Sequence, residues 1–271
     1  MTTMTTGVAE VAAGPEAPDL IIENADAVVT VTFNRPGKLN SLTPQMYEDL
    51  GRVCERVNAD PTVRLLVVRG AGRAFAAGSD IAHFRTFTDG ADGVAYEDRF
   101  VQVLERLEQV RVPTLAVIDG ACVGAGLIVA AACDVRVATT RSYFGLPIAR
   151  TLGNALSAYP LALLTDRLGS ARLASMVARA TMLPAAEAAS IGFVIEPAGL
   201  GLFDDLVTEV TGQLLAAAPL TVVATREVLR RIRTAGLPES ADLIRAVYGS
   251  ADFRAGVTAF LQGGRAEWSG S

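Results

Sequence analysis

The chain has 271 residues and a formal net charge of −5 without any basic run, which excludes nucleic acid and anionic membrane surfaces as main partners. Its length suffices for one large domain with a substantial core. Its three cysteines have neither an even count nor the spacing of metal ligands, which predicts buried thiols in a reduced, cytoplasmic protein without a metal site.

Residues 1–18 contain no basic residue and no long apolar stretch, so we predict a flexible tail and no signal peptide. The longest apolar run, 121–133, is too short to span a bilayer and contains two glycines. No membrane contact is therefore expected.

The first third of the chain predicts alternating strands and helices. A β-hairpin is expected over 19–33, and Thr43-Pro44 provides an N-cap and a first-turn proline for a helix to about residue 58. A strand over 64–69 leads into a glycine turn. The polar stretch 85–98 is predicted as a mobile wall over a pocket, followed by a helix over 100–109.

The middle of the chain has the most distinctive pattern. A strand over 115–118 turns at Asp119-Gly120, passes Gly124 to Gly126 and continues as an apolar helix over 127–133, followed by a strand over 135–138. A helix that is apolar all round belongs in a core. Strands that alternate with helices in this way favour an α/β domain with parallel strand pairs.

The remainder of the chain is predicted to be mainly helical. A turn is expected over 144–147 and a short strand over 192–195, with Pro184 as the first residue of its helix. We place a soft domain boundary near 197–202. The helices expected after the turn cover 158–168, 171–180, 184–190, 203–215, 219–233 and 238–260. The apolar stripes of the last three need a partner, either the core or a neighbouring subunit.

Two segments, 64–80 and 115–133, each consist of a strand, a glycine turn and the start of a helix. In each, free backbone N–H groups at the helix start can point at a negative ligand atom. Asp80 is a plausible N-cap in the first segment, and Asp134 caps or bonds the turn after the second helix. Together the two segments can supply one N–H each to a single oxygen, although a lone glycine turn more often serves close packing. Gly120, Gly124 and Gly126 do not form a dinucleotide fingerprint.

Six tracts of the chain, in one order, resemble the crotonase superfamily, the enoyl-CoA hydratase/isomerase family. They are TFNRPGKLNSL (32–42), GRAFAAGSDI (72–81), VPTLAVIDGACVGAGLIVAAACDVRVA (112–138), FGLP (144–147), LPAAEAASIGFV (183–194) and DFRAGVTAFL (252–261). The resemblance implies the α/β crotonase (ClpP/crotonase-like) fold. Repeated ββα units would spiral into two roughly perpendicular sheets over 19–200, and 201–271 would form a helical oligomerisation region. It further implies a homotrimer or homohexamer.

The resemblance also implies an oxyanion hole and the loss of two acids. The backbone N–H groups of Ser79 and Ala125 would hold the carbonyl oxygen of a CoA thioester. Family members that hydrate double bonds carry glutamates at the positions of Ile128 and Ile148. Isoleucine neither binds nor deprotonates water, and each acid/base group commonly contributes about 10²–10⁴-fold. Ordinary hydratase activity is therefore not expected by the usual route.

Other candidate catalytic groups each have an ordinary structural alternative. Arg150 would pair with a carboxylate of the acyl group or steady an enolate, or else form a surface or inter-subunit salt bridge. His83, the only histidine, follows Ser79 by four residues and is either catalytic or a satisfied, half-buried side chain. Asp80 is expected to be an N-cap rather than a base.

By resemblance, coenzyme A enters as part of the substrate, with no separate cofactor. Gly263 stands where relatives often have a phosphate-binding lysine, and Arg265 is a candidate substitute. The candidate substrate-binding residues are Arg35, Lys38, Ala76, Ala77, Gly78, Asp80, Ile81, Gly124, Phe260 and Arg265.

Two functions follow from these patterns. The first is an acyl-CoA enzyme of fatty acid metabolism that uses the oxyanion hole for isomerisation, decarboxylation or thioester hydrolysis. The second is a non-catalytic acyl-CoA binder, which the two isoleucines favour.

Overall fold

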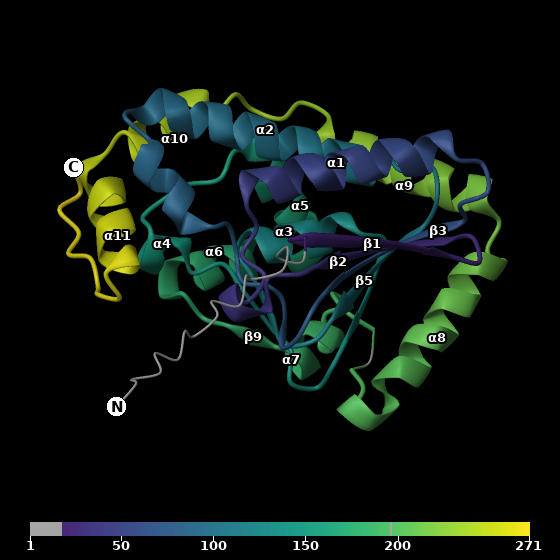
Figure 1. The fold of residues 1–271 in the computed structure, drawn as a ribbon. Coiled ribbons are helices and arrows are strands. Elements are labelled where there is room, and N and C mark those ends of the chain that lie inside the picture. The colour runs from purple at the N-terminus through teal and green to yellow at the C-terminus, as the bar shows by residue number, and fades with distance from the viewer. Residues whose placement is uncertain (1–17, 196) are drawn as a thin grey trace, which may run out of the picture.

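The computed structural model describes residues 18–195 and 197–271. Two sheets form its core (Figure 1). The first sheet has the strand order β1-β2-β3-β5-β7, with β1 and β2 as an antiparallel hairpin and the other pairs parallel. Its strands are β1 (Leu20–Ala25), β2 (Val28–Phe33), β3 (Leu65–Gly70), β5 (Thr114–Ile118) and β7 (Val135–Ala138). The expected hairpin and the three following strands are confirmed.

The second sheet is smaller and has the order β4-β6-β8-β9. Its strands β4 (Ala74–Ala76), β6 (Ala121–Val123) and β8 (Tyr143–Gly145) run parallel, and β9 (Leu183–Pro184) pairs antiparallel with β8. Each strand of the first sheet from β3 onward is followed by one strand of the second sheet and then by a helix. The expected ββα repeat is therefore confirmed.

The turn between β5 and β6, consecutive strands of different sheets, requires glycine because the chain segments approach closely. Gly120 lies between β5 and β6 at φ +81°, and a Cβ atom there would lie 2.1 Å from the carbonyl oxygen of Arg73. Any side chain at this position would push apart the β3–β4 and β5–β6 crossovers. Successive repeats can thus stack directly on one another.

Eleven α-helices and two short 3₁₀ helices surround the sheets within the described residues. They are η1 (Pro36–Lys38), α1 (Pro44–Ala59), η2 (Ile81–Thr86), α2 (Gly90–Glu108), α3 (Ala125–Ala132), α4 (Ile148–Thr151), α5 (Ala158–Leu168), α6 (Ser170–Arg179), α7 (Ala185–Ser190), α8 (Leu200–Ala216), α9 (Pro219–Thr234), α10 (Ala241–Tyr248) and α11 (Ala251–Leu261). All eight residues of α3 are buried, as their composition predicts. Thr43 caps α1, since its side chain accepts from the N–H of Met46.

The stretch 85–98, predicted as a mobile wall over a pocket, does line two hollows, but most of it is helical, so the helix expected from residue 100 begins earlier. Helix α2 begins at Gly90, where Asp89 and Asp92 form a capping box. Its buried face starts with glycines rather than large apolar residues because α10 lies against it: a Cβ atom on Gly93 would lie 2.2 Å from the Tyr248 ring. The apolar spacing that normally reveals a helix is therefore missing from its first turn.

Four smaller expectations also need correction. Phe144 lies in strand β8 rather than in a turn, and residues 192–195 form turns and bends rather than a strand. Pro184 precedes helix α7 as its N-cap and pairs in β9. The helix expected over 238–260 is divided into α10 and α11, because Ser250 caps a new helix by accepting from the N–H of Phe253.

The C-terminal helices pack on the core. Phe203 and Val210 of α8 join a buried cluster with Leu65 and Val67 of β3, and α10 lies along α2. Helices α8 and α11 lie at opposite ends of the molecule (Figure 1). Apolar side chains remain uncovered on the outer helices, with Leu220 85% exposed. The trimeric or hexameric assembly stays a prediction.

Within the described ranges, no helix taken singly has the length and apolar character needed to cross a membrane. Helices α8 and α9 pass that test only together, and they are bent by 96°.

Candidate active site

A cavity of about 220 Å³ lies where the turn after β4, the start of α3 and the start of α4 meet. Ala77, Gly78 and Ser79 form one wall, and Gly124 and Ala125 form the next. Helix α2 closes another side, and α11 contributes Phe260 near the mouth, where this ring is half exposed. The cavity therefore lies at the carboxyl ends of the short parallel strands.

The two N–H groups singled out from the sequence both belong to residues that line this cavity. Leu42 donates to the carbonyl of Gly78 and accepts from the N–H of Asp80, each at 2.8 Å. The intervening Ser79 N–H has no hydrogen-bond partner within the described part of the chain. Ala125 is the first residue of α3, so its N–H lies beyond the intrahelical ladder.

The two turns that carry these groups touch each other. A Cβ atom on Gly124, which has φ +58°, would lie 3.2 Å from the Cα of Gly78. A Cβ atom on Gly126 would lie 2.2 Å from the carbonyl oxygen of Ala76, so α3 starts directly against β4. Glycine is required here for close packing, and that packing brings the Ser79 and Ala125 turns together. The close-packing explanation for these glycines is thus confirmed, and the supply of two N–H groups to one oxygen stays a prediction.

The two isoleucines that the resemblance places at acid positions, Ile128 and Ile148, both line the same cavity. Ile128 lies one turn into α3 and is 1% exposed, and Ile148 is the first residue of α4. The cavity wall is hydrocarbon at both positions. No water-binding acceptor is provided by either side chain.

Other predicted binding residues divide into two groups. Ala77, Gly78, Ile81, Gly124 and Phe260 line the cavity, whereas Ala76 is fully buried behind it in β4.

Arg35 and Asp80 hold a loop rather than the cavity. The Arg35 guanidinium pairs with Asp80 at 2.9 Å and with Asp19 at 3.5 Å. Asp80 caps η2 by accepting from the N–H of Ala82, as expected from the sequence. Neither Arg35 nor Asp80 lines the cavity.

The remaining cationic candidates also lie outside the cavity. Arg150 is exposed and reaches only the carbonyl of Arg179, at 3.5 Å. Lys38 and Arg265 are exposed. His83 is half-buried in a separate hollow beside Tyr96 and Arg99, and burial and the Arg99 charge lower its pKa.

Sequence reasoning missed Glu97, a cavity-lining residue of α2 that is 2% exposed. Its Oε2 accepts from the N–H of Ser157 at 2.8 Å, and its Oε1 accepts from the hydroxyl of Tyr248 at 3.1 Å. Burial raises the pKa of Glu97, although both hydrogen bonds oppose the shift. The signal that could have revealed Glu97 is its helical spacing with Phe100 and Leu104, which places the three residues on one helix face. This signal is recognisable only if the helix is taken to begin at Gly90 rather than at residue 100.

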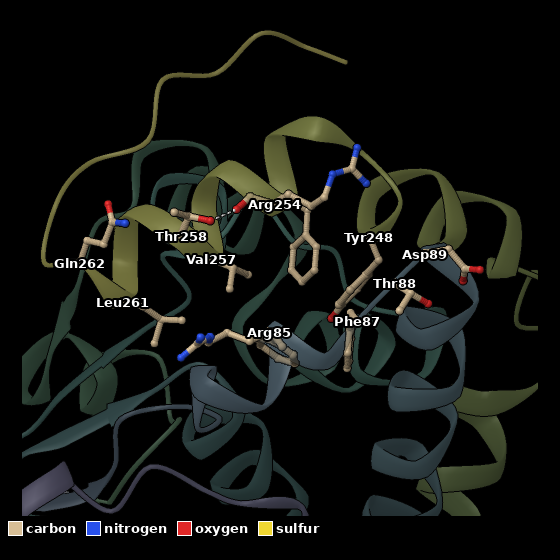
Figure 2. Close-up of a pocket in the computed structure, with 12 residues that line it drawn as sticks. Arg85, Phe87, Thr88, Asp89, Tyr248, Arg254, Val257, Thr258, Leu261 and Gln262 are labelled. Atoms are coloured by element: carbon tan, nitrogen blue, oxygen red, sulfur yellow. Dashed lines mark hydrogen bonds between the residues drawn. The ribbon is translucent and has the colours of Figure 1, made fainter.

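A second hollow of about 540 Å³ lies between η2 and α11 (Figure 2). Phe84 lines both hollows. Tyr248 lines the second hollow beside Phe87, with ring centroids 6.0 Å apart, while its hydroxyl bonds to Glu97 of the first. The charged residues that line the second hollow are Arg85, Asp89 and Arg254, and the Arg254 guanidinium donates to the carbonyl of Gly249 (Figure 2).

The side chain of Ser79 has a structural role apart from its backbone. Its hydroxyl lies 2.6 Å from the Tyr96 hydroxyl and 2.9 Å from that of Tyr47, and both rings are buried. We expect Ser79→Ala to lower the free energy of unfolding by about 1–3 kcal/mol because two buried phenols lose a partner. Urea denaturation measures this. Ser190→Ala, at an exposed serine that bonds its own helix, is the control and should change stability by less than about 0.5 kcal/mol. Equal stability of both variants would contradict the prediction.

The fold and cavity define a crotonase-fold protein. The sequence model of the enoyl-CoA hydratase/isomerase family matches residues 23–271, and the chain belongs to that family.

Particular relatives agree with this assignment. The chain is 34% identical over 214 residues to (E)-benzylidenesuccinyl-CoA hydratase of Thauera aromatica, which covers 76% of this chain and 80% of that protein. It is 36% identical over 177 residues to a probable enoyl-CoA hydratase of Mycobacterium leprae, covering 62% of this chain and only 59% of that protein's length. A structure of methylmalonyl-CoA decarboxylase in complex with 2-nitronate-propionyl-CoA superposes with a TM-score of 0.85 at 22% identity, over 94% of this chain and 99% of that one. That likeness establishes the fold alone.

Proposed function

We propose that the protein is an acyl-CoA enzyme that polarises a thioester carbonyl with the backbone N–H groups of Ser79 and Ala125. The observation that carries this proposal is the pair of touching turns whose N–H-bearing residues line one cavity. Polarising the carbonyl acidifies the adjacent carbon and stabilises an enolate or a tetrahedral centre. One such donor is typically worth about 2.7–4 kcal/mol in a transition state.

The chemistry at the far side of the cavity differs from ordinary hydration. Ile128 and Ile148 fill the positions where a water would be held, and buried hydrocarbon disfavours that water. Isomerisation, decarboxylation and thioester hydrolysis remain as reactions that use the oxyanion hole. A non-catalytic acyl-CoA binder is the second candidate, and the same two isoleucines favour it.

Two cationic side chains of the protein are candidates for binding the phosphates at the nucleotide end of the substrate. Lys38 and Arg265 are exposed and form no ion pair among the described residues, so both are available for phosphate. Arg35 is committed to Asp80 and Asp19, and we assign it to holding the loop.

Proline substitution tests the oxyanion hole because it removes the donor itself. Ala125→Pro is the sharper variant, since proline is well accepted as the first residue of a helix. We expect Ala125→Pro to lower kcat for any thioester reaction about 10²–10³-fold with folding retained. Ser79→Pro should act likewise on the other turn. Circular dichroism and thermal unfolding provide the folding control, and unchanged kcat in a folded Ala125→Pro protein would contradict the proposal.

A panel of acyl-CoA thioesters distinguishes the two candidate functions. Free CoA, released CO₂ and double-bond migration are measured in parallel, and binding is measured by calorimetry. Turnover of any panel member supports the enzyme, and binding without turnover supports the binder. If the protein binds none of the thioesters, both candidate functions are contradicted.

A further inference from the structure

Glu97 is the only carboxylate among the described residues that line the cavity. We propose that Glu97 is its catalytic acid/base residue, which exchanges a proton with the α-carbon of a bound acyl thioester. This inference rests on the function proposed above and adds a proton-transfer group on a wall where the family pattern does not place one.

Helix α2 fixes Glu97 relative to the oxyanion turn. The preceding residue, Tyr96, lies with its hydroxyl 2.6 Å from the Ser79 hydroxyl, so the helix is tied to the turn that carries the Ser79 N–H. On its other side, α2 is held against α10 at Gly93 and Tyr248. Two contacts of α2 therefore position the Glu97 carboxyl group: that of Tyr96, the preceding residue, with Ser79, and that of Gly93, one turn earlier, with Tyr248.

The hydrogen bonding of Glu97 leaves capacity for a ligand. Each carboxylate oxygen has two lone pairs, and in this structure each accepts one hydrogen bond, from Ser157 or Tyr248. Asn154, which lines the same cavity, has a buried Oδ1 without a partner within the described ranges. Glu97 itself keeps one unused lone pair on each carboxylate oxygen.

Comparison with a second buried glutamate of α2 shows what is unusual about Glu97. Glu108 is paired with the guanidinium of Arg233 at 2.7 Å and accepts from the Tyr159 hydroxyl at 2.7 Å. Glu97 forms no ion pair in the described part of the chain, although it is equally buried. An unpaired buried carboxylate is costly to a fold, and such groups are typical of functional sites.

The proposed step balances within the site. The Glu97 carboxylate accepts the α-proton as the C–H bond breaks, and the electron pair of that bond forms the carbon–carbon double bond of the enolate. The thioester carbonyl becomes an oxyanion held by the Ser79 and Ala125 N–H groups. Return of a proton from the carboxylic acid to carbon completes the exchange. In D₂O the carboxylic acid exchanges its proton with solvent before the return, so the particle that reaches carbon is a deuteron.

Deuterium incorporation from D₂O into 3-butenoyl-CoA and butyryl-CoA tests the proposal without knowledge of the natural reaction. We expect Glu97→Gln to lower the exchange rate at least about 10²-fold while the Kd for butyryl-CoA changes less than about threefold. Glu97→Asp keeps a carboxylate and should exchange faster than Glu97→Gln. Glu108→Gln is the matched control on the same helix and should retain exchange. Thermal unfolding of each variant shows that it is folded.

The pH profile gives a readout that a structural role would not move. The titratable groups that interact electrostatically with Glu97 are Tyr96 and the exposed Asp98 of its own helix, Tyr47 of α1 and Tyr248 of α10, while α3 contributes none. Burial raises the pKa values of the tyrosines among them, so they stay neutral near pH 7. Exchange should increase with pH as Glu97 ionises, above the ordinary range of a glutamate, and level off.

The outcomes distinguish a failure of the proposed role of Glu97 from a failure of the proposed acyl-CoA function. Equal exchange by the unmodified protein and folded Glu97→Gln overturns the role of Glu97 and leaves the oxyanion hole standing. Tight binding of butyryl-CoA without exchange of either thioester also overturns it and favours a non-catalytic binder. Failure to bind any thioester overturns the proposed function, and the role of Glu97 with it.

Discussion

Purified protein should hydrate short enoyl-CoA substrates at least ~10³-fold more slowly than family members that carry glutamates at both usual positions. Hydration adds the elements of one water across the double bond, and that water has to be held by acceptors on the cavity wall. Ile128 and Ile148 present branched hydrocarbon there instead. The loss of enoyl-thioester absorbance measures the rate, with a two-glutamate relative assayed under the same conditions.

Restoring the acids tests the same explanation from the opposite direction. Ile128→Glu and Ile148→Glu together should raise hydration, whereas each single change should do little, because residues that act as a unit are not additive. Ile128 lies in an entirely buried apolar helix, so its glutamate will also lower stability. Ordinary turnover by the unmodified protein would contradict our explanation. Glu97 rather than His83 or Arg150 would then be the first residue to test, because it alone of the three lines the cavity.

Arg226→Ala should lower the free energy of unfolding by about 3–5 kcal/mol. Arg226 is a helix α9 residue with an 8% exposed side chain. It donates to Asp134 at 2.8 Å, to the carbonyl of Val112 at 3.1 Å and to the carbonyl of Val110. The substitution leaves a largely buried carboxylate without its cation and separates α9 from the start of β5. Urea denaturation measures the change.

The same helix provides a control for this prediction. Arg231 forms an ion pair with Glu227 at 2.6 Å, but its side chain is 73% exposed. Arg231→Ala should therefore cost less than about 1 kcal/mol. Similar losses in the two variants would show that burial of the Arg226 pair is not what anchors α9.

The sequence determined the repeated architecture through the resemblance of its tracts to the family, and some single elements through local signals. Thr43-Pro44 begins α1, and the uninterrupted apolar run 127–133 can only be a core helix. The predictions for Ser79, Ala125, Ile128 and Ile148 came from the resemblance of their tracts to the family's motifs, and the structure adds that all four residues line one cavity.

Tertiary structure alone decided which acid reaches the cavity and how the C-terminal helices attach. Glu97 lies in a stretch whose buried face begins with glycines, because Tyr248, 151 residues away, occupies the space that larger side chains would fill. Arg226 finds Asp134 across 92 residues. Such pairs leave no periodic trace in the chain, since the partner of a buried polar group is set by packing between distant segments and not by its neighbours in sequence.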